Sequence, residues 1–487
     1  MRTPQLVAVA LSALLAQNGV SAKEMVPDAA TSALYDSGVI HERLMAKKHA
    51  TWDRQRASGA MNSSQYQSYR QPGAGEFSAQ AFVPCTNGVA TVVAGNAMQT
   101  FKCKNIDYYD FVSHANLGSR TGEGSSSWGW TSPTGREFVV IAQADGAAFA
   151  EITSAGKLVY LGRLPQASGA ATSIWREIRG YKNYIVIGSE AVNHGIQVFD
   201  MSKLLTANPA SPTTYSVTAD VTSVWNGLPN GRTHNVVINE EKNYAVAVGA
   251  QPRTSTCRSG LIFIDLVDPK NPKTLGCAAG DGYVHDAQCL VYRGPDTRYV
   301  GRDICYGYNE DTLTIYDVTN KNSTTIISRT SYTGASYTHQ GWVTDPMNQQ
   351  FLVLDDELDE ENRVGPAAQG RPITYFWDIR TLTAPRQTGY FRSSATGIDH
   401  NQFVVDGFTY QSNYGSGLRV LDLRSLPTTP TGASVTEAAF FDVYPEDDAQ
   451  GGVVDFVGTW SHYPFFKSGY ILVNTIERGA FVLKRTT

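Results

Sequence analysis

The sequence is poor in charge, and its basic residues are scattered. Asp, Glu, Lys and Arg together make up 17% of the 487 residues, and the formal net charge is -5. Lys and Arg nowhere form a cluster longer than a pair. A nucleic-acid-binding protein needs a concentrated basic surface, because it must neutralise phosphates. We therefore expect no nucleic-acid partner.

Long hydrophobic runs are missing after the first residues. A membrane-spanning helix takes about 20 apolar residues, and the largely apolar stretch 6–16 is too short for one. This stretch follows Arg2 and precedes the small residues Val20-Ser-Ala22, which is the pattern of a secretory signal peptide. We predict that residues 1–22 are a signal peptide and that the protein is secreted and extracellular. We expect no transmembrane segment.

Several common cofactor and catalytic motifs are also missing. No GxGxxG or GxxxxGK[ST] loop is present, so a nucleotide cofactor is not expected. No GxSxG motif marks a nucleophilic serine, and no CxxC pair marks a thiolate metal site. A ligand set assembled around a ring would carry no such local spacing.

What the sequence does contain is a sevenfold repeat. Each repeat opens with a short strand start, and an apolar strand that usually ends in Asp follows about 20 to 35 residues later. The seven starts are Trp128-Gly-Trp, Trp175-Arg-Glu, His234-Asn-Val, His285-Asp-Ala, His339-Gln-Gly, His400-Asn-Gln and Trp460-Ser-His. The matching outer strands are Phe149-Ala-Glu-Ile, Gln197-Val-Phe-Asp, Ile262-Phe-Ile-Asp, Thr314-Ile-Tyr-Asp, Tyr375-Phe-Trp-Asp, Arg419-Val-Leu-Asp and Ala480-Phe-Val-Leu.

The spacing of the repeats predicts the fold. Consecutive starts lie 47 to 61 residues apart, which is the period of a propeller blade with loops of variable length. Apolar and β-branched segments alternate with turn signals inside the repeats, as at Tyr184-Ile-Val-Ile. We predict an all-β protein, a seven-bladed β-propeller over residues 119–487 with a short N-terminal extension. The extension comprises a polar arm or linker, 23–79, and a disulfide-containing cap segment, 80–118.

The six cysteines form an even set in a chain predicted to be exported, which favours disulfides. Pairing each Cys with its neighbour in sequence gives Cys85–Cys103, Cys257–Cys277 and Cys289–Cys305. Six cysteines allow fifteen connectivities, and this choice favours the shortest loops. Asn62-Ser-Ser and Asn322-Ser-Thr are sequons at which a secreted protein could be glycosylated.

Four consecutive repeats place a histidine at the same position. Because the innermost strands of a propeller line its central channel, we expect these four imidazoles to face one another. Neutral imidazoles are common ligands of Zn, Cu and Fe, and Asp286 and Asp399 beside two of them could orient the rings. Alternatively, each histidine joins neighbouring blades as a structural element. The four histidines are His234, His285, His339 and His400.

A stretch of carboxylates, Asp355-Asp-Glu-Leu-Asp-Glu-Glu361, follows the apolar strand 351–354. Such crowded carboxylates repel one another unless a cation or a basic partner neutralises them, and their oxygens favour Ca²⁺. The stretch lacks the Asp-x-Asp-x-Asp-Gly spacing of a calcium loop. It fits either a calcium site near Asp355–Glu361 or a solvated acidic loop. Asp355 or Asp356 could instead act as a ligand or general base beside the histidines.

Some of these segments carry a family resemblance. The strands Gln197-Val-Phe-Asp, Ile262-Phe-Ile-Asp, Thr314-Ile-Tyr-Asp and Arg419-Val-Leu-Asp resemble the LVIVD repeat. Longer stretches resemble the choice-of-anchor B family of exported proteins, namely Gly282-Tyr-Val-His-Asp-Ala-Gln-Cys289, Tyr337-Thr-His-Gln-Gly-Trp342, Leu354-Asp-Asp-Glu-Leu-Asp-Glu360 and Tyr444-Pro-Glu-Asp-Asp448. The resemblance covers roughly residues 80–485 and implies a secreted or surface-displayed β-propeller of no settled activity.

Because Lys484-Arg-Thr-Thr487 carries no hydrophobic tail or sorting signal, we expect no C-terminal anchor.

Two functions of different classes fit these observations. The first is a non-catalytic extracellular binding or adhesion module for a protein or glycan. The alternative is a metalloenzyme, either a hydrolase or an oxidoreductase, whose channel histidines hold one ion while Asp286, Asp355 or Asp399 moves protons. We favour the first function, because the sequence shows no complete catalytic set.

Overall fold

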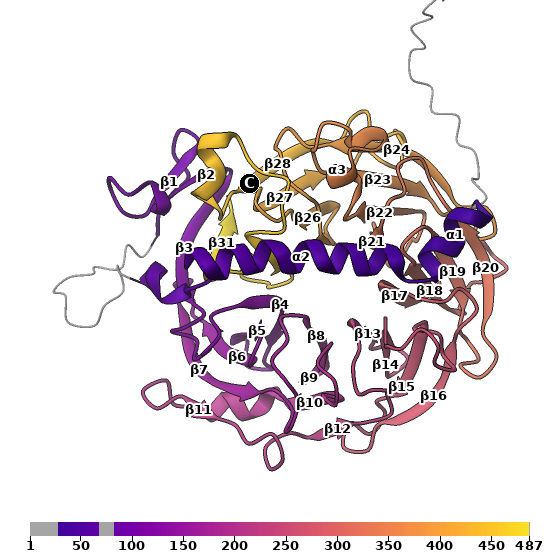
Figure 1. Ribbon diagram of the computed structural model, residues 1–487, viewed down its shortest axis with the longest axis horizontal. Helices are drawn as coiled ribbons and strands as arrows, with labels where there is room; N and C mark the ends of the chain where they lie inside the picture. The colour runs from indigo at the N-terminus through magenta and orange to yellow at the C-terminus, as the bar shows by residue number, and fades with distance from the viewer. Residues whose placement is uncertain (1–27, 68–81, 487) are drawn as a thin grey trace, which may run out of the picture.

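Seven β-sheets stand side by side around a central axis, like the blades of a propeller (Figure 1). The computed structural model of the protein describes residues 28–67 and 82–486. The predicted fold is therefore confirmed, as a seven-bladed β-propeller preceded by short helices. The predicted signal peptide lies outside the described residues.

The first four blades follow one another along the chain, each running from the axis outward. The first consists of β4 (Gly124–Thr131), β5 (Glu137–Gln143), β6 (Gly146–Ile152) and β7 (Leu158–Pro165), with the short β11 (Thr213–Thr214) added parallel to β7. The second consists of β8 (Arg176–Tyr181), β9 (Tyr184–Ser189), β10 (Ile196–Asp200) and β12 (Ser223–Trp225). The third consists of β13 (Asn235–Asn239), β14 (Tyr244–Val248), β15 (Leu261–Asp265) and β16 (Lys273–Ala278). The fourth consists of β17 (Asp286–Val291), β18 (Asp303–Tyr308), β19 (Leu313–Asp317) and β20 (Thr325–Thr330).

The last three blades complete the ring. The fifth consists of β21 (Thr338–Val343), β22 (Phe351–Asp356), β23 (Ile373–Asp378) and β24 (Arg386–Arg392). The sixth consists of β25 (Asn401–Val405), β26 (Phe408–Ser412), β27 (Leu418–Asp422) and β28 (Thr436–Phe441), extended by β2 (Thr100–Lys104) and β1 (Val89–Thr91). The seventh consists of β29 (Thr459–Tyr463), β30 (Tyr470–Thr475), β31 (Gly479–Arg485) and β3 (Ile106–Ser113). The strands predicted as outer ones are the third of each blade, and a fourth strand lies outside each of them.

The ring is closed by strands from opposite ends of the chain. β3 pairs antiparallel with β31, from Ile106 opposite Arg485 to Ser113 opposite Gly479. The segment 80–118, predicted as a cap, thus supplies the fourth strand of the last blade as well as β1 and β2 on the sixth. This pairing covers the outer edge of β31 and makes β3 the rim strand of the last blade.

Face-to-face packing of the blades explains why the strands of the repeats are continuous apolar segments in the sequence. The second strand of a blade is covered on both faces by its neighbours, so β14, with the sequence Tyr-Ala-Val-Ala-Val, is buried at every residue. The fourth strands lie at the rim, and β16 exposes its first residues. A strand that is covered on both faces, such as β14, therefore shows no alternation of apolar and polar residues in its sequence.

The three disulfides join the pairs predicted from sequence order, Cys85–Cys103, Cys257–Cys277 and Cys289–Cys305. The last of them links β17 directly to β18. The two sequon residues, Asn62 and Asn322, are both exposed.

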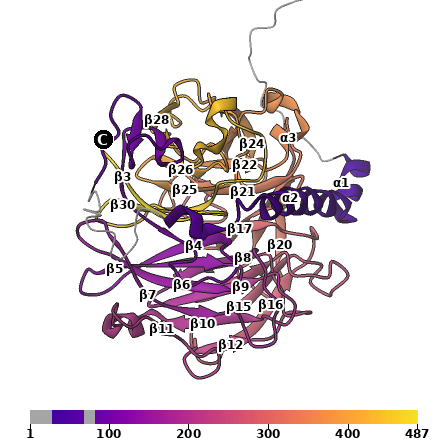
Figure 2. The ribbon, with the colours of Figure 1, turned by 60° about the vertical axis from the view of Figure 1, so that its left-hand side comes forward.

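The N-terminal extension is helical where it is described. α1 (Ala29–Asp36) leads into α2 (Val39–Ser58), which crosses the centre of the ring in Figure 1 and lies on one face of the propeller in Figure 2. Among the described residues no helix is long and apolar enough to cross a membrane. The remaining helical turns are η1 (Ser63–Gln67), η2 (Ala97–Gln99), η3 (Met201–Thr206), α3 (Asp359–Asn362), η4 (Gly365–Ala367) and η5 (Pro445–Gln450).

A buried histidine of the second blade gives the fold a testable pH dependence. His194 donates from Nδ1 to the carbonyl of Gly195 and accepts at Nε2 from Arg176, at 2.9 and 2.7 Å. Burial, with the charge of Arg176, lowers its pKa from 6.5 to about 3. The unfolded chain thus takes up a proton near pH 6.5 that the folded chain takes up only near pH 3. This histidine therefore favours folding above pH 6.5 and loses that contribution as the pH falls.

We expect the stability advantage of the wild type over His194→Gln to shrink as the pH falls from 6.5 toward 4. The change should approach about 1.4 kcal/mol per pH unit, the value for one proton. Urea unfolding of both proteins across this range measures it. Parallel pH profiles would contradict the assignment of a neutral, buried imidazole.

Candidate metal site in the propeller channel

The four predicted histidines meet at the axis of the propeller. His234, His285 and His400 each immediately precede an inner strand, and His339 is the second residue of β21. The centroids of neighbouring rings lie 4.1, 4.2 and 4.5 Å apart along the series. Since all four come from adjacent blades, they form a continuous arc of imidazoles on one side of the channel.

Each ring of the arc is held through its Nδ1 atom by an oxygen. The partners are the Glu190 carboxylate for His234, the His339 carbonyl for His285 at 3.0 Å, Asp355 Oδ1 for His339 at 3.1 Å and the Trp460 carbonyl for His400 at 2.7 Å. A carbonyl oxygen only accepts, so Nδ1 carries the proton in His285. His400 Nδ1 lies near both the Trp460 carbonyl and the side-chain amide nitrogen of Asn401, at 2.7 and 2.9 Å. Asp355 Oδ1 also accepts from the Gln340 N–H at 2.9 Å, which makes it an acceptor toward His339 as well. The Nε2 atoms of His285 and His339 are thereby left with lone pairs.

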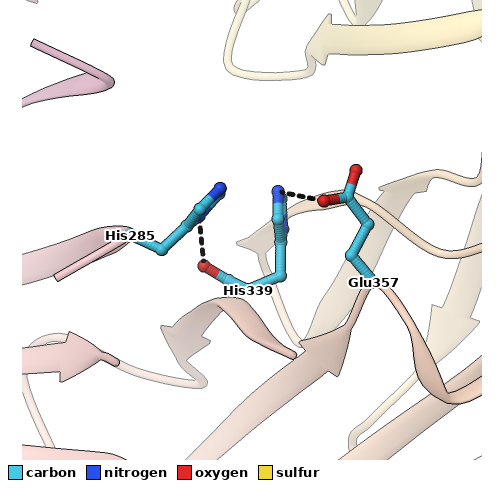
Figure 3. A group of neighbouring side chains, drawn as sticks. All are labelled: His285, His339 and Glu357. Atoms are coloured by element: carbon cyan, nitrogen blue, oxygen red, sulfur yellow. Dashed lines mark hydrogen bonds and ion pairs between the residues drawn. The ribbon is translucent and has the colours of Figure 1, made fainter. Parts of the chain in front are cut away.

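A carboxylate faces these lone pairs. Glu357 follows β22, and its Oε2 lies 3.8 Å from His339 Nε2, while its Oε1 lies 3.8 Å from His400 Nε2. Ligand atoms of His285, His339 and Glu357 all lie within 4.8 Å of one another. Figure 3 shows both imidazoles pointing toward the space beside the carboxylate. Within the described residues, Glu357 Oε2 is buried and has no hydrogen-bond partner.

Helix α2 brings a cation to this carboxylate. Lys48 Nζ lies 2.6 Å from Glu357 Oε1, and both side chains are buried, with 2% and 0% exposed. The Tyr414 hydroxyl donates to the same oxygen at 2.5 Å. The helix is anchored over the axis by Trp52, whose indole N–H donates to the carbonyl of Phe456 at 2.9 Å. α2 therefore caps the channel and places its only fully buried lysine in the site.

The electrostatics keep the ligand groups in the forms that bind metals. Burial, together with neighbouring histidines and Lys48, lowers the pKa of His285 and of His339 well below the usual range. The pKa of His400 is lowered in the same way. Burial opposes the ionisation of Glu357, but the charge of Lys48 and the hydrogen bonds from Lys48 and Tyr414 outweigh it and lower the pKa of this carboxyl. Neutral imidazoles and an ionised carboxylate are what a metal ion requires.

The three predicted catalytic carboxylates have different surroundings. Asp355 touches the arc, since it bonds His339. Asp286 lies 3.8 Å from Arg179, and burial raises its pKa to about 6. Asp399 accepts from the Ile373 N–H at 3.1 Å and lies with other carboxylates, away from the imidazole of His400. Of the three, only Asp355 contacts a ring of the arc.

The acidic stretch is not a solvated loop. Five of its carboxylates are at most 1% exposed, and Glu361 pairs with Lys47 at the surface. The buried ones are Asp355, Asp356, Glu357, Asp359 and Glu360. Neither Glu357 nor Lys48 is among the individual site residues predicted from the sequence. Glu357 could have been found from its position, since it follows the strand that pairs with β21, whereas Lys48 lies in a segment with no repeat to place it.

A groove beside α2 leads toward the arc. Its volume is about 750 Å³, and its lining includes His41, Glu190, Arg232 and Arg253. Glu190 is the partner of His234, so the groove reaches the shell of residues around the arc. The residues that line it include none of the four arc histidines.

The buried Lys48–Glu357 pair should be essential to the metal-free fold. Lys48→Met should lower the free energy of unfolding by about 3–5 kcal/mol, because it leaves a buried carboxylate without its cation. The double variant Lys48→Met/Glu357→Gln should recover much of the loss, since no charge then remains unpaired. Denaturant unfolding of metal-free protein measures both.

Lys47→Met is the matched control for this experiment. Lys47 pairs with Glu361 at the surface, so its replacement should cost less than about 1 kcal/mol. Equal losses in the single Lys48 variant and the double variant would show that the pair itself does not stabilise the fold.

No protein-family model and no curated protein sequence matches the chain. The structure by itself thus establishes the seven-bladed β-propeller, and the resemblance to choice-of-anchor B proteins stays a prediction from the motifs.

Proposed function

We propose that the protein is a secreted metalloprotein that binds one transition-metal ion in its channel through His285, His339 and Glu357. The observation that carries the proposal is the anchoring of every Nδ1 in the arc on an oxygen. Metal-binding histidines usually donate their second ring nitrogen to a carboxylate or carbonyl, which fixes the ring and makes the other nitrogen a better ligand. The Nδ1 bonds of His285 and His400 also join neighbouring blades, since their acceptors lie on the next blade. What blade joining does not require is the approach of Nε2 of His339 and of His400 to one carboxylate, Glu357, at 3.8 Å.

The donor set favours a borderline transition metal. Imidazole nitrogens suit Zn, Cu and Fe, whereas Ca²⁺ and Mg²⁺ prefer oxygen ligands. Two histidines and one carboxylate leave coordination positions open, and His400 Nε2 lies 3.8 Å from the other oxygen of Glu357. Open positions allow an ion to polarise a substrate or to activate a bound water, as in hydrolases, or to meet dioxygen, as in oxidoreductases.

Lys48 links metal binding to helix α2. Its ammonium neutralises Glu357 in the metal-free protein, so an ion on that carboxylate displaces or repels it. A lysine side chain is long and flexible enough to move without unfolding the helix. The helix therefore sets the affinity of the site, because each ion must compete with a charge that is already in place.

Secretion and family membership remain part of the proposal. Three disulfides fit an oxidising compartment, and the LVIVD-like strands occupy the third position of their blades. We infer on this basis an extracellular protein of the choice-of-anchor B type. The expected role as a binding or adhesion module for a protein or glycan stays a prediction, since no contact among the described residues favours a particular partner.

Elemental analysis of untagged protein from a secreting host tests the metal site. We expect about one Zn, Cu or Fe per chain, or its uptake after stripping and reloading. His285→Ala, His339→Ala and Glu357→Gln should each lose the metal, because each removes a ligand. His462→Ala is the matched control, since this buried histidine bonds Ser412 through Nδ1 and lies outside the ligand group.

Two results would contradict the proposal. One is a protein that contains no transition metal and takes up none on reloading. The other is metal that stays bound in all three ligand variants, which would place it elsewhere.

A further inference from the structure

A second group of carboxylates lies buried behind the channel. Asp359 and Glu360 open α3, and Asp399 immediately precedes His400. Their ligand oxygens lie within 4.8 Å of one another, and none of the three residues is more than 1% exposed. The group contains no imidazole, so its chemistry differs from that of the channel site.

Four oxygens of this group lack partners. Within the described residues no N–H or O–H group donates a hydrogen bond of ordinary geometry to either carboxylate oxygen of Glu360, to Asp359 Oδ1 or to Asp399 Oδ1, while the carboxyl groups of Asp359 and Glu360 lie close enough to share a proton. The other two oxygens are fixed, since Asp359 Oδ2 accepts from the Tyr375 hydroxyl at 2.6 Å and Asp399 Oδ2 accepts from the Ile373 N–H at 3.1 Å. Asp359 and Asp399 are thus each held by one oxygen, while the fully buried Glu360 side chain, which has no N–H or O–H donor, places an oxygen within 4.8 Å of both.

The neighbouring Asp356 shows what a structural carboxylate looks like in this loop. Its oxygens accept from the Tyr332 hydroxyl and from the N–H groups of Ser336 and Tyr337, at 2.6 to 2.8 Å. Buried polar atoms are normally paired in this way. The orphaned oxygens of Asp359, Glu360 and Asp399 therefore need another explanation.

Positively charged side chains of the protein do not neutralise these three carboxylates. Among the described residues, no lysine, arginine or histidine forms an ion pair with any of these three carboxylates. Buried, unpaired charges are costly. The group must therefore either take up protons or bind a cation from solution.

We propose that Asp359, Glu360 and Asp399 form a calcium-binding site. Hard carboxylate oxygens are the preferred ligands of Ca²⁺ at about 2.3–2.6 Å, so two of them on one ion lie at most about 5 Å apart. The observed separations fall inside that limit. Mg²⁺ demands octahedral geometry and keeps several waters, for which a group this deeply buried is poorly suited. Backbone carbonyls or waters would complete the shell.

The ion would have a structural effect on the channel. One residue, Leu358, separates Glu357 from the start of α3, and Asp399 immediately precedes His400. An ion shared by Asp359 and Asp399 therefore ties the loop that carries Glu357, on the fifth blade, to the start of the sixth blade. The calcium site does not depend on the proposed transition metal, since it shares no ligand with it.

The competing explanation is a set of shared protons. Burial raises the pKa of all three carboxyls well above the usual range, and their mutual repulsion raises it further. Without an ion, the three can stay buried only by remaining partly protonated. Such a group would lose stability as the pH rises, and calcium would not change it.

Calcium titration of the full-length protein after EGTA treatment distinguishes the two. We expect one Ca²⁺ per chain by calorimetry and a melting temperature that rises by about 3 °C at a hundred times the dissociation constant. Tb³⁺ should bind at the same site and luminesce when tyrosine is excited, because the Tyr375 hydroxyl contacts Asp359. Competition by Ca²⁺ should quench that signal. This luminescence test uses the wild type alone, so it does not depend on the folding of a variant.

The variants locate the ion. Glu360→Gln should weaken Ca²⁺ binding roughly tenfold or more, because a charged ligand is lost. The matched control, Glu361→Gln, changes the next residue of α3, which pairs with Lys47 at the surface, and should bind as the wild type does. His285→Ala should also bind Ca²⁺ normally, which separates this site from the channel.

Either of two outcomes would overturn the proposal. A stripped wild type that binds neither Ca²⁺ nor Tb³⁺ would establish the shared protons instead. Unchanged binding by both Glu360→Gln and Asp399→Asn would place the ion elsewhere.

Discussion

Pairing between β3 and β31 closes the ring, and the rest of the architecture depends on it. Once the seventh blade is completed by a strand from the beginning of the chain, all seven inner strands converge on one axis. The residues at their starts are then removed from bulk water. Whatever polar groups they carry must pair with one another, with the backbone or with a ligand. The chemistry of the channel follows from that confinement.

The channel meets this demand with groups that are only partly paired. The arc of histidines uses its Nδ1 atoms on carbonyls and carboxylates, and it turns its Nε2 atoms toward Glu357. Lys48 then neutralises the carboxylate from the capping helix. Removing either charge would leave the other buried without its ionic partner, which is why the pair matters to the metal-free fold. The same arrangement presents nitrogen ligands and a carboxylate to a common space, which is the basis of the proposed metal site.

Two neighbouring groups of acids thus offer cations different donor atoms. The channel group mixes nitrogen and oxygen donors, whereas Asp359, Glu360 and Asp399 offer oxygen alone. Ligand softness separates the ions that each would select. One short connection, between β22 and β23, contributes to both groups. The acidic stretch that looked like a single feature in the sequence is therefore divided between two sites.

The sequence by itself determined the blades, the disulfide pairs and the histidine arc. These are periodic or local properties: strand composition repeats with the blade, short loops favour neighbouring cysteines, and equivalent positions of a repeat face the same axis. Only the tertiary structure decided that Lys48 lies on Glu357, that β3 completes the last blade, and that Asp399 joins Asp359 and Glu360 rather than His400. These contacts join non-repeating segments far apart in the chain. Their partners are set by how helix α2 and the connecting loops dock on the finished propeller, which no pattern within the repeats encodes.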